Sequence, residues 1–377
     1  MRGALINVRV LDLTHAMAGP MCTMFLAGMG AEVLKIEPPW GEMTRFFPPL
    51  VKGVSPFFAY LDRNKKGITL NLKKEKGVEI FKELVKRSDV VVENFSAGVM
   101  DRLGLGYEVL SGINPRIIFV SITGFGQTGP YSTRLSFDPI AQAVSGFMTL
   151  TGQEVDQPGG PVQVAEAIGD SVPAMQAVIG ILAALYNRQF TGRGQRIDLA
   201  QLDSLVSIFP SVTFWTMGGI TFRDALNKFR VGPSGLYRAK DGYVAVTAPE
   251  GDIQERLLKV MDEKSFEMPK FKEWLQNRKV EEVVKLLIEA RIPVGPVQDL
   301  SQAISDPHVQ AREMIVEVDC PGVGKVKMPG FPLKLSATPG NLNEPAPALG
   351  QHNEEVLTSL LGYSREDMAK LKQEQVI

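Results

Sequence analysis

The sequence predicts an α/β protein, in which a parallel sheet is covered by helices on both faces. In the first half of the chain, short apolar runs alternate with stretches whose apolar residues recur at helical spacing. Such alternation is typical of parallel strands joined by helical crossovers. The chain has 377 residues, 44% of them hydrophobic, so it is long enough for a large core and for two domains.

The elements of this sheet are predicted in chain order. Strands are expected at residues 8–13, 32–37, 68–72, 90–92, 117–122 and 196–199. A first helix is expected at residues 20–28, and a second carries Val78, Phe81, Leu84 and Val85 at helical spacing. Residues 174–185 are apolar on almost every side, which predicts a helix buried all round.

A different pattern follows in the second half. Residues 235–238 and 242–247 predict a hairpin, and residues 280–290 predict an amphipathic helix, so a smaller α+β domain is expected over residues 228–310. The Pro- and Gly-rich residues 321–347 predict an extended segment. Two helices are expected at the end, the second with a capping box of Ser364 and Asp367.

Charge and composition exclude several classes of protein. Lys and Arg (41) nearly balance Asp and Glu (42), so no long-range field favours nucleic acid or an anionic membrane as a partner. The two cysteines, Cys22 and Cys320, indicate no disulfide framework, although a single disulfide stays possible. The three histidines lie far apart without HExxH spacing, so no metal site is expected.

The location is expected to be cytoplasmic. The first ten residues lack the apolar core of a secretory signal. The longest apolar stretch, residues 174–185, is shorter than the roughly 20 residues that a membrane span needs.

Two motifs are ambiguous from spacing alone. Residues 124–129 match GxGxxG after a predicted strand, but Pro130 and Pro139 interrupt the helix that a dinucleotide-binding loop requires, so a plain glycine loop is favoured. Asp170 and Ser171 precede the apolar helix. Spacing favours a helix cap, yet a carboxylate at a helix N-terminus is also an ionised, available nucleophile. His15 lacks an identified partner and is either a base or a bystander.

A set of short motifs, in order along essentially the whole chain, resembles the class III coenzyme A transferases. This family includes formyl-CoA and carnitine-CoA transferases, and 2-methylacyl-CoA racemase shares its fold. The matching stretches are residues 10–14 with 19–20, 30–37, 64–66, 70–73, 92–95, 114–118, 124–126, 169–170, 191–195 and 292–297.

The resemblance implies a Rossmann-like large domain with a smaller α+β domain and a C-terminal return to the large domain. The expected limits are residues 1–205 for the first part of the large domain, 206–227 for a linker, 228–310 for the small domain and 311–377 for the return. It further implies an interlocked homodimer, and a heteromer with a sister subunit is the alternative.

The resemblance also implies chemistry. Coenzyme A is expected as substrate and carrier, with no tightly bound cofactor. The family's nucleophilic aspartate matches Asp170, which would form an aspartyl anhydride and then an aspartyl-CoA thioester. Backbone N–H groups at Gly232 and Gly235 are candidate oxyanion donors. The family's CoA contacts fall on Ala16, Met17, Leu70, Lys73, Asn94, Phe95, Arg102, Arg134 and Asp138.

Departures from the family pattern refine these expectations. Pro38 stands where many members have a nucleotide-contacting arginine, and Arg45 is a candidate replacement. The racemases carry a histidine where this chain has Phe137, and phenylalanine cannot transfer the α-proton, so transferase is preferred over racemase or epimerase. A CoA-binding, non-catalytic subunit of a paired complex is the third alternative, and the presence of Asp170 argues against it.

Overall fold

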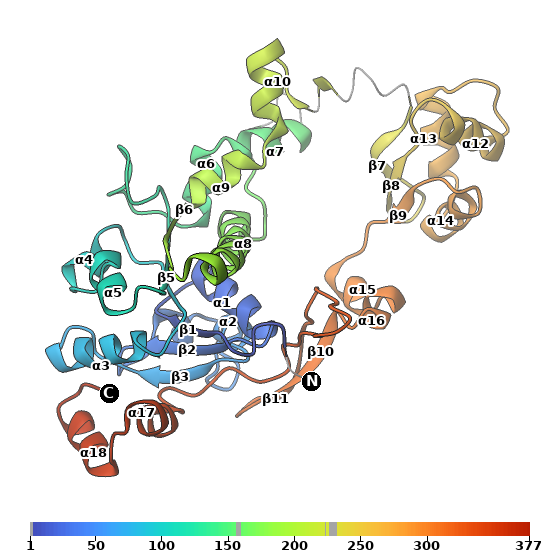
Figure 1. Cartoon of the computed structure of the whole chain (residues 1–377). Helices are drawn as coiled ribbons and strands as arrows, with labels where there is room; N and C mark the ends of the chain where they lie inside the picture. Colours follow the sequence, from blue (N-terminus) through green and yellow to red (C-terminus); the bar gives the residue numbers. More distant parts are fainter. Residues whose placement is uncertain (1–2, 156–159, 223, 226–231) are drawn as a thin grey trace. The chain divides into compact units, whose positions relative to one another are not determined.

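The computed structural model describes residues 3–155, 160–222, 224–225 and 232–377. The chain forms two compact units (Figure 1), the first comprising Met1–Ile208 with Arg312–Ile377, and the second Phe209–Ala311. The boundary expected between residues 227 and 228 lies outside the described residues. The predicted domain limits therefore stay a prediction.

A six-stranded sheet lies at the centre of the first unit, in the order β3-β2-β1-β4-β5-β6. Every neighbouring pair is parallel, as the sequence predicted. The strands are β1 (Arg9–Asp12), β2 (Glu32–Glu37), β3 (Lys66–Thr69), β4 (Val90–Glu93), β5 (Ile118–Thr123) and β6 (Arg196–Ala200). This strand order is that of doubly wound nucleotide-binding folds, whose direction of progression reverses between the first and fourth strands.

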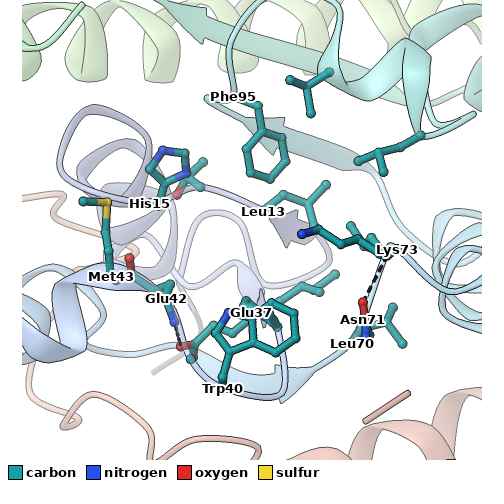
Figure 2. Close-up of a pocket in the computed structure, with 17 residues that line it drawn as sticks. Leu13, His15, Glu37, Trp40, Glu42, Met43, Leu70, Asn71, Lys73 and Phe95 are labelled. Carbon is teal, nitrogen blue, oxygen red and sulfur yellow. Dashed lines mark hydrogen bonds between the residues drawn. The ribbon is translucent and has the colours of Figure 1, made fainter. Parts of the chain in front are cut away.

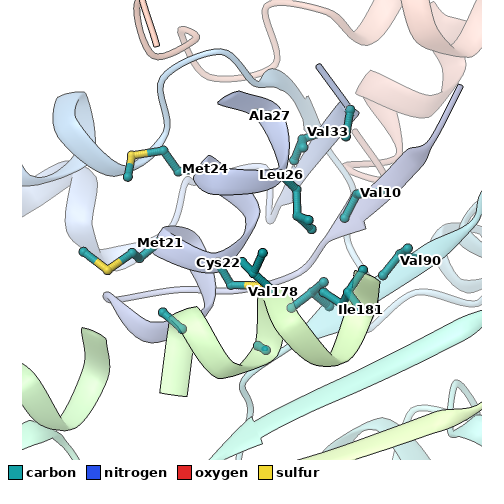
Figure 3. Close-up of a cluster of buried hydrophobic side chains, with 14 of the residues drawn as sticks. Val10, Met21, Cys22, Met24, Leu26, Ala27, Val33, Val90, Val178 and Ile181 are labelled. Carbon is teal, nitrogen blue, oxygen red and sulfur yellow. The ribbon is translucent and has the colours of Figure 1, made fainter. Parts of the chain in front are cut away.

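One face of the sheet packs on α1 (Ala18–Gly28) and α8 (Ile168–Thr191). Every second residue of a strand points to this face. Among them, Val10 of β1 and Val90 of β4 pack with Cys22 of α1 and Ile181 of α8 (Figure 3). Cys22 is a free, buried thiol of this core, and Cys320 is also free.

The other face is covered by α3 (Glu75–Val85), α5 (Tyr107–Ile113), α17 (Asn353–Leu361) and α18 (Arg365–Gln373). Leu11 and Val91 point to this side, one residue away from the valines of the first face. Strands β4 and β5 are thus apolar on both faces, which is why they appear in the sequence as continuous apolar runs.

Helix α8 differs from its prediction. It starts at Ile168 and has 24 residues, which makes it long and apolar enough to cross a membrane by length and composition alone. One side packs in the core, but the opposite side exposes a stripe of Met175, Ile179, Tyr186 and Phe190, between 51% and 72% exposed. The expectation of a helix buried all round is therefore wrong for the single chain.

The second unit is a small α+β structure. Strands β7 (Ser234–Arg238), β8 (Tyr243–Thr247) and β9 (Val294–Pro296) form an antiparallel sheet, so the predicted hairpin is confirmed. Its core is shared with three helices, namely α12 (Asp252–Met261), α13 (Met268–Gln276) and α14 (Val280–Glu289).

The C-terminal stretch of the first unit contains a hairpin that the sequence did not predict. Strand β10 (Ile315–Cys320) pairs with β11 (Gly324–Pro329), and only β11 lies within residues 321–347, where an extended segment was expected. The capping box that starts α18 at Ser364 is confirmed.

The remaining elements are η1 (Met43–Phe46), α2 (Pro56–Leu61), α4 (Val99–Arg102), α6 (Asp138–Val144), α7 (Phe147–Val155), α9 (Gln201–Ser207), α10 (Pro210–Gly218), α15 (Leu300–Ser305) and α16 (Pro307–Ala311).

Candidate active site

Two adjoining cavities lie at the carboxyl ends of the parallel strands, where open α/β sheets bind their ligands. Both are formed by the first unit alone. They share His15, Phe95 and Val99 in their walls, so the loops after β1 and β4 separate one from the other. This position is the switch point of the sheet, because β1 and β4 are neighbours whose crossovers run in opposite directions.

The first of them, here called the Asp170 cavity, has a volume of about 340 Å³. Its walls come from residues 15–18 after β1, 94–97 after β4 and 122–124 at the end of β5, and from the segment that contains Arg134 and Phe137. Asp170 and Gln201 complete it. The predicted site residues Ala16, Met17, Asn94, Phe95, Arg134 and Asp170 are therefore brought together here.

The second, here called the Trp40 cavity, has a volume of about 470 Å³ and lies beyond the ends of β1, β2 and β3 (Figure 2). Trp40 and Phe95 give it aromatic walls, and Leu70 and Lys73 line it as well. Lys73 is exposed and its backbone N–H donates to Asn71 Oδ1 at 3.1 Å, which fixes the turn after β3.

Asp170 lies in the first turn of α8 without capping it. The N-cap position belongs to Ala167, and Pro173 lies inside the helix, so the cap interpretation of the sequence is wrong. The Asp170 carboxylate is instead held by a side chain, because Gln201 Nε2 donates to Asp170 Oδ1 at 2.5 Å.

The electrostatics of Asp170 also differ from the expectation of a carboxylate held ionised. Burial, followed by repulsion from Asp138, raises the pKa of Asp170 to about 7, and the hydrogen bond from Gln201 opposes this shift only in part. Near neutral pH, a carboxyl group with such a pKa is protonated in some molecules and ionised in others. Raised carboxyl pKa values of this kind are concentrated at functional sites.

Asp138 lies beneath Asp170 and lines neither of the two cavities. It is 7% exposed, and its carboxylate accepts from the Gly169 N–H at 2.7 Å and from Gln142 Nε2 at 2.9 and 3.0 Å. A Cβ at residue 169 would lie 2.9 Å from Asp138 Oδ1, so the chain needs glycine immediately before Asp170. Asp138 thus fixes the backbone immediately before Asp170.

The loop after β1 is fixed from two sides. Asn94 hydrogen-bonds the backbone of His15, and Lys35 Nζ donates to the carbonyl oxygen of Thr14 at 2.5 Å. Ala16 has a left-handed φ of 58°, a conformation that costs energy for a residue other than glycine. These contacts hold the strained loop that forms part of both cavities.

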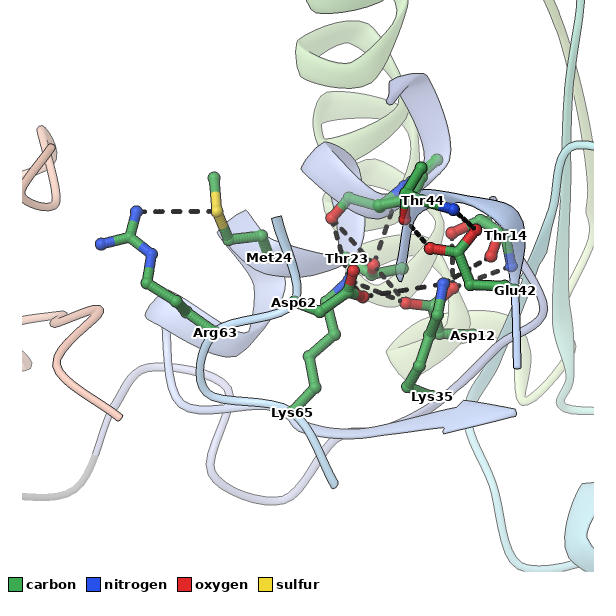
Figure 4. A network of polar contacts seen from close by, with 12 residues as sticks. Asp12, Thr14, Thr23, Met24, Lys35, Glu42, Thr44, Asp62, Arg63 and Lys65 are labelled. Atoms are coloured by element: carbon green, nitrogen blue, oxygen red, sulfur yellow. Dashed lines mark hydrogen bonds and ion pairs between the residues drawn. The ribbon is translucent and has the colours of Figure 1, made fainter. Parts of the chain in front are cut away.

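Lys35 belongs to a network of fully buried charges below the loop (Figure 4). Lys65 Nζ contacts Asp12 Oδ2 at 2.9 Å and Asp62 Oδ1 at 2.8 Å, and Lys35 Nζ lies 3.6 Å from Asp62 Oδ1. Burial alone would raise the pKa of Asp12, but Lys35 and Lys65 outweigh it and hold this pKa far below its usual range. The end of β1 is therefore anchored by paired charges.

The basic residues predicted to hold CoA phosphates are placed differently. Arg134 lies over the Tyr131 ring, 3.5 Å from its centroid, in the wall of the Asp170 cavity. Arg102 is exposed and lines neither of the two cavities. Arg45, the candidate replacement for the arginine missing at Pro38, forms a two-pronged ion pair with Glu37 at 2.6 and 2.7 Å, so its guanidinium is already engaged.

The side chains of His15 and Phe137 bear on the choice of chemistry. Burial, and then Lys35, lower the pKa of His15, whose ring lies 5.6 Å from that of Phe95. The imidazole is thus mainly neutral at pH 7. Phe137 is 57% exposed in the wall of the Asp170 cavity, at the position where a racemase would need an acid or base.

The GxGxxG stretch does not form a dinucleotide-binding turn, because no helix starts between residue 124 and Asp138. Gly124 is instead required by a close approach, since a Cβ there would lie 2.1 Å from Ser136 Cβ. Gly232 and Gly235, the predicted oxyanion donors, belong to the second unit, and their role stays a prediction.

Sequence reasoning missed Gln201, the residue that contacts the Asp170 carboxylate directly. It is the first residue after β6, and the rule that ligands bind at the carboxyl ends of the strands was the one signal that pointed to it.

The chain belongs to CoA-transferase family III, whose family model matches residues 5–353. The doubly wound sheet described above is thus that of a class III CoA-transferase. It is 35% identical to succinyl-CoA–D-citramalate CoA-transferase of Chloroflexus aurantiacus over 98% of this chain and 97% of the relative. It is 34% identical to the succinyl-CoA–L-malate CoA-transferase beta subunit of the same organism, over 99% and 98%. A CAIB/BAIF family protein from Brucella suis has a similar structure, with a TM-score of 0.83 and 28% identity over 96% of this chain and 100% of that chain.

Proposed function

We propose that the chain moves coenzyme A from an acyl-CoA donor to a carboxylic acid, with Asp170 as the covalent nucleophile. The observation that carries this proposal is the place of Asp170. Its carboxylate lines a cavity at the switch point of the sheet, next to a second cavity with aromatic walls. A nucleophile beside a binding site for the carrier is what CoA exchange requires.

The reaction proceeds in four balanced steps. A carboxylate oxygen of Asp170 attacks the donor thioester carbonyl, and the CoA thiolate leaves, giving an aspartyl–acyl anhydride. The thiolate then attacks the aspartyl carbonyl, and the donor acid leaves as a carboxylate. The acceptor carboxylate attacks the resulting aspartyl-CoA thioester and expels the thiolate again. The thiolate finally attacks the acceptor's carbonyl, which forms the new acyl-CoA and restores the Asp170 carboxylate.

The two cavities suit the two ends of an acyl-CoA. We place the adenine in the Trp40 cavity, where Trp40 and Phe95 offer aromatic surfaces for stacking and Lys73 offers a positive charge for a phosphate. The thioester would then lie in the Asp170 cavity, and the pantetheine arm would pass His15 and Phe95, which both cavities share.

Succinyl-CoA is the donor we propose to test first, because both relatives from C. aurantiacus are named for it. Arg134 is the one arginine or lysine among the described residues that line the Asp170 cavity. Its guanidinium would pair with the second carboxylate of a dicarboxylic acyl group.

We further propose that two identical chains interlock as a dimer, with the exposed apolar stripe of α8 in their interface. Apolar stripes of this extent are uncommon on the free surface of a soluble chain. The relative named as a beta subunit makes a heteromer the alternative assembly.

The decisive experiment compares the wild-type protein with Asp170→Ala. Purified protein is given succinyl-CoA and a panel of carboxylic acids, and acyl-CoA products are separated by chromatography. We expect Asp170→Ala to abolish exchange and to keep CoA affinity, measured by calorimetry, within about threefold. Asp262→Asn is the control, since this exposed residue has a left-handed φ of 58° that asparagine also adopts.

Two further readouts separate the proposal from its alternatives. Hydroxylamine added to enzyme and acyl-CoA should convert Asp170 into a hydroxamate that mass spectrometry locates, and a label on another residue would refute the mechanism. Acyl-CoA incubated in heavy water should gain no α-deuterium, whereas rapid gain would indicate a racemase. Absence of exchange with every acid, in well-folded protein, would favour the non-catalytic subunit.

A further inference from the structure

Gln201 is the first residue of α9 and one of the most buried polar residues near the Asp170 cavity, with 6% of its surface exposed. Its Nε2 donates to Asp170 Oδ1 at 2.5 Å. Its Oε1 accepts from the Ser136 hydroxyl at 2.9 Å. Both ends of the amide are thus engaged, one by the proposed nucleophile and the other by a serine of the cavity wall.

The orientation of this amide follows from its two partners. A carboxylate accepts hydrogen bonds, so an amide turned the other way would place its carbonyl oxygen against a negative oxygen. The Ser136 hydroxyl, which can donate or accept, donates to the amide oxygen in the orientation that the carboxylate selects. The backbone beneath is also tied, because the Leu202 N–H donates to the Gly124 carbonyl at 3.1 Å.

The contact makes the two oxygens of Asp170 unequal. Oδ1 is occupied by Gln201, while Oδ2 accepts no hydrogen bond from any residue in the described part of the chain. The free oxygen keeps its lone pairs for attack. The bonded oxygen becomes the carbonyl oxygen of the anhydride and of the aspartyl thioester.

We propose that Gln201 is a catalytic residue, which selects Asp170 Oδ2 as the attacking atom and donates a hydrogen bond to Oδ1 when the aspartyl carbonyl is itself attacked. This proposal rests on the covalent role of Asp170 proposed above. In the second step the thiolate sulfur bonds to the aspartyl Cγ, and the electron pair of the C=O bond moves to Oδ1. The Cγ–Oδ2 bond then breaks, and Oδ2 leaves with the donor's carboxylate.

A donor already placed at Oδ1 stabilises this negative charge without having to reorganise. The third step, in which the acceptor carboxylate attacks the aspartyl thioester, develops charge on the same oxygen and uses the same donor. The first and fourth steps develop charge on the substrate's carbonyl oxygen, so Gln201 does not serve them in this way.

The test is Gln201→Met, which keeps the size of the side chain and removes the donor. We expect single-turnover formation of the aspartyl-CoA thioester, read by rapid quenching and mass spectrometry of the intact CoA adduct on Asp170, to slow about 100-fold. The affinity for CoA should change less than about threefold. Measurements are made at high pH, where Asp170 is ionised in both proteins, and Gln195→Met is the control, since Gln195 is exposed and lines neither cavity.

Gln201→Glu supplies a second, independent readout. A glutamic acid donates to Oδ1 only while it is protonated, so its rate of thioester formation, divided by that of Gln201→Met at the same pH, should increase as the pH falls. Ser136→Ala should slow the same step more weakly, and it replaces Gln201→Met if that protein does not fold.

The outcomes distinguish this proposal from the one it rests on. Thioester formation within twofold of wild type in Gln201→Met, or in Ser136→Ala and Gln201→Glu together, overturns the role of Gln201 and leaves Asp170 in place. If wild-type Asp170 is never labelled by hydroxylamine, it is the covalent mechanism that fails.

Discussion

Asn94 holds the peptide groups on both sides of His15: its Oδ1 accepts from the His15 N–H at 2.9 Å, and its Nδ2 donates to the His15 carbonyl at 2.7 Å. The two residues are 79 positions apart in the chain, at the ends of β4 and β1. The resemblance gave Asn94 as a CoA contact, but both ends of its amide are engaged by the loop. We therefore propose that Asn94 contributes to binding by positioning Ala16 and Met17, which line the Asp170 cavity.

Replacing Asn94 by alanine should therefore weaken binding more than chemistry. With the two hydrogen bonds gone, the strained loop at Ala16 relaxes, and we expect the KM for acyl-CoA to rise about 10-fold while kcat falls less than about threefold. Steady-state kinetics with varied acyl-CoA measures both. Asn114→Ala is the matched control, because the Asn114 amide likewise holds the backbone, by donating from Nδ2 to the carbonyls of Val85 and Ser88, away from the cavities. An unchanged KM in Asn94→Ala would contradict the positioning role.

The sheet could be predicted because all of its strands except β6 are mostly buried on both faces. Continuous runs such as residues 90–92 admit few other structures when polar residues bound them on each side. The prediction failed where an apolar helix face can pack either in the core of its own chain or against another chain. Helix α8 is apolar all round, yet one of its faces is exposed in the single chain, and sequence alone does not distinguish a core contact from a contact with a second chain.

Asp138 is predicted to add to the effect of burial on the pH dependence of the reaction. Its charge contributes to the raised pKa of Asp170, about 7, and only ionised Asp170 is a nucleophile, so kcat/KM should increase as the pH rises through about 7. Asp138→Asn removes the like charge while leaving an oxygen to accept from Gly169. We expect the acidic limb of the kcat/KM profile to move to lower pH. Asp203→Asn, an exposed aspartate of α9, should leave the limb in place, and an unmoved limb in Asp138→Asn would exclude the electrostatic role.

The same pKa shift predicts a cost in stability at Asp170. The carboxyl group titrates near 3.8 when unfolded and near 7 when folded, so the folded state binds the proton more tightly. Its contribution to stability is present below about pH 4 and is lost as the pH rises to about 7. Asp170→Asn does not ionise and escapes this loss. We expect its Tm advantage over wild type to be larger at about pH 8 than at about pH 4, by calorimetry, and an equal Tm difference at both values would contradict the raised pKa.

The Asp170 contacts could not be predicted because they join parts of the chain that share no pattern. Gln201 is 31 residues from Asp170, and its amide has no sequence feature that separates it from a surface glutamine. The helix start was also misplaced. Asp170 and Ser171 resemble a cap, but the helix begins at Ile168, because Asp138 accepts the Gly169 N–H from another element. Only the packing of α6 against α8 makes that contact possible.

The buried charges beneath the β1 loop should make Lys35 important for stability as well as for the site. Lys35→Met leaves the Thr14 carbonyl without its donor and Asp62 without one of its two lysines. Removing one partner from a buried ion pair costs about 3–5 kcal/mol of unfolding free energy. Denaturant unfolding measures this loss. Lys66→Met is the control, since Lys66 is 36% exposed, and we expect its loss to stay below about 1 kcal/mol. Similar losses of unfolding free energy in both variants would show that the burial of Lys35 does not increase its contribution to stability.

The exposed stripe of α8 is predicted to be covered by a second chain. Ile179 is 66% exposed and lies between Met175 and Tyr186 along one face of the helix. A charge placed in an apolar interface is desolvated without a partner, so Ile179→Glu should convert the dimer into monomers, or shift its dissociation constant at least about 100-fold. Sedimentation velocity at several concentrations measures the change. Gln189→Glu adds the same charge at an exposed polar position of the same helix and should leave the assembly unchanged. A wild-type monomer would refute the proposed dimer, and an Ile179→Glu dimer of wild-type affinity would place the interface elsewhere.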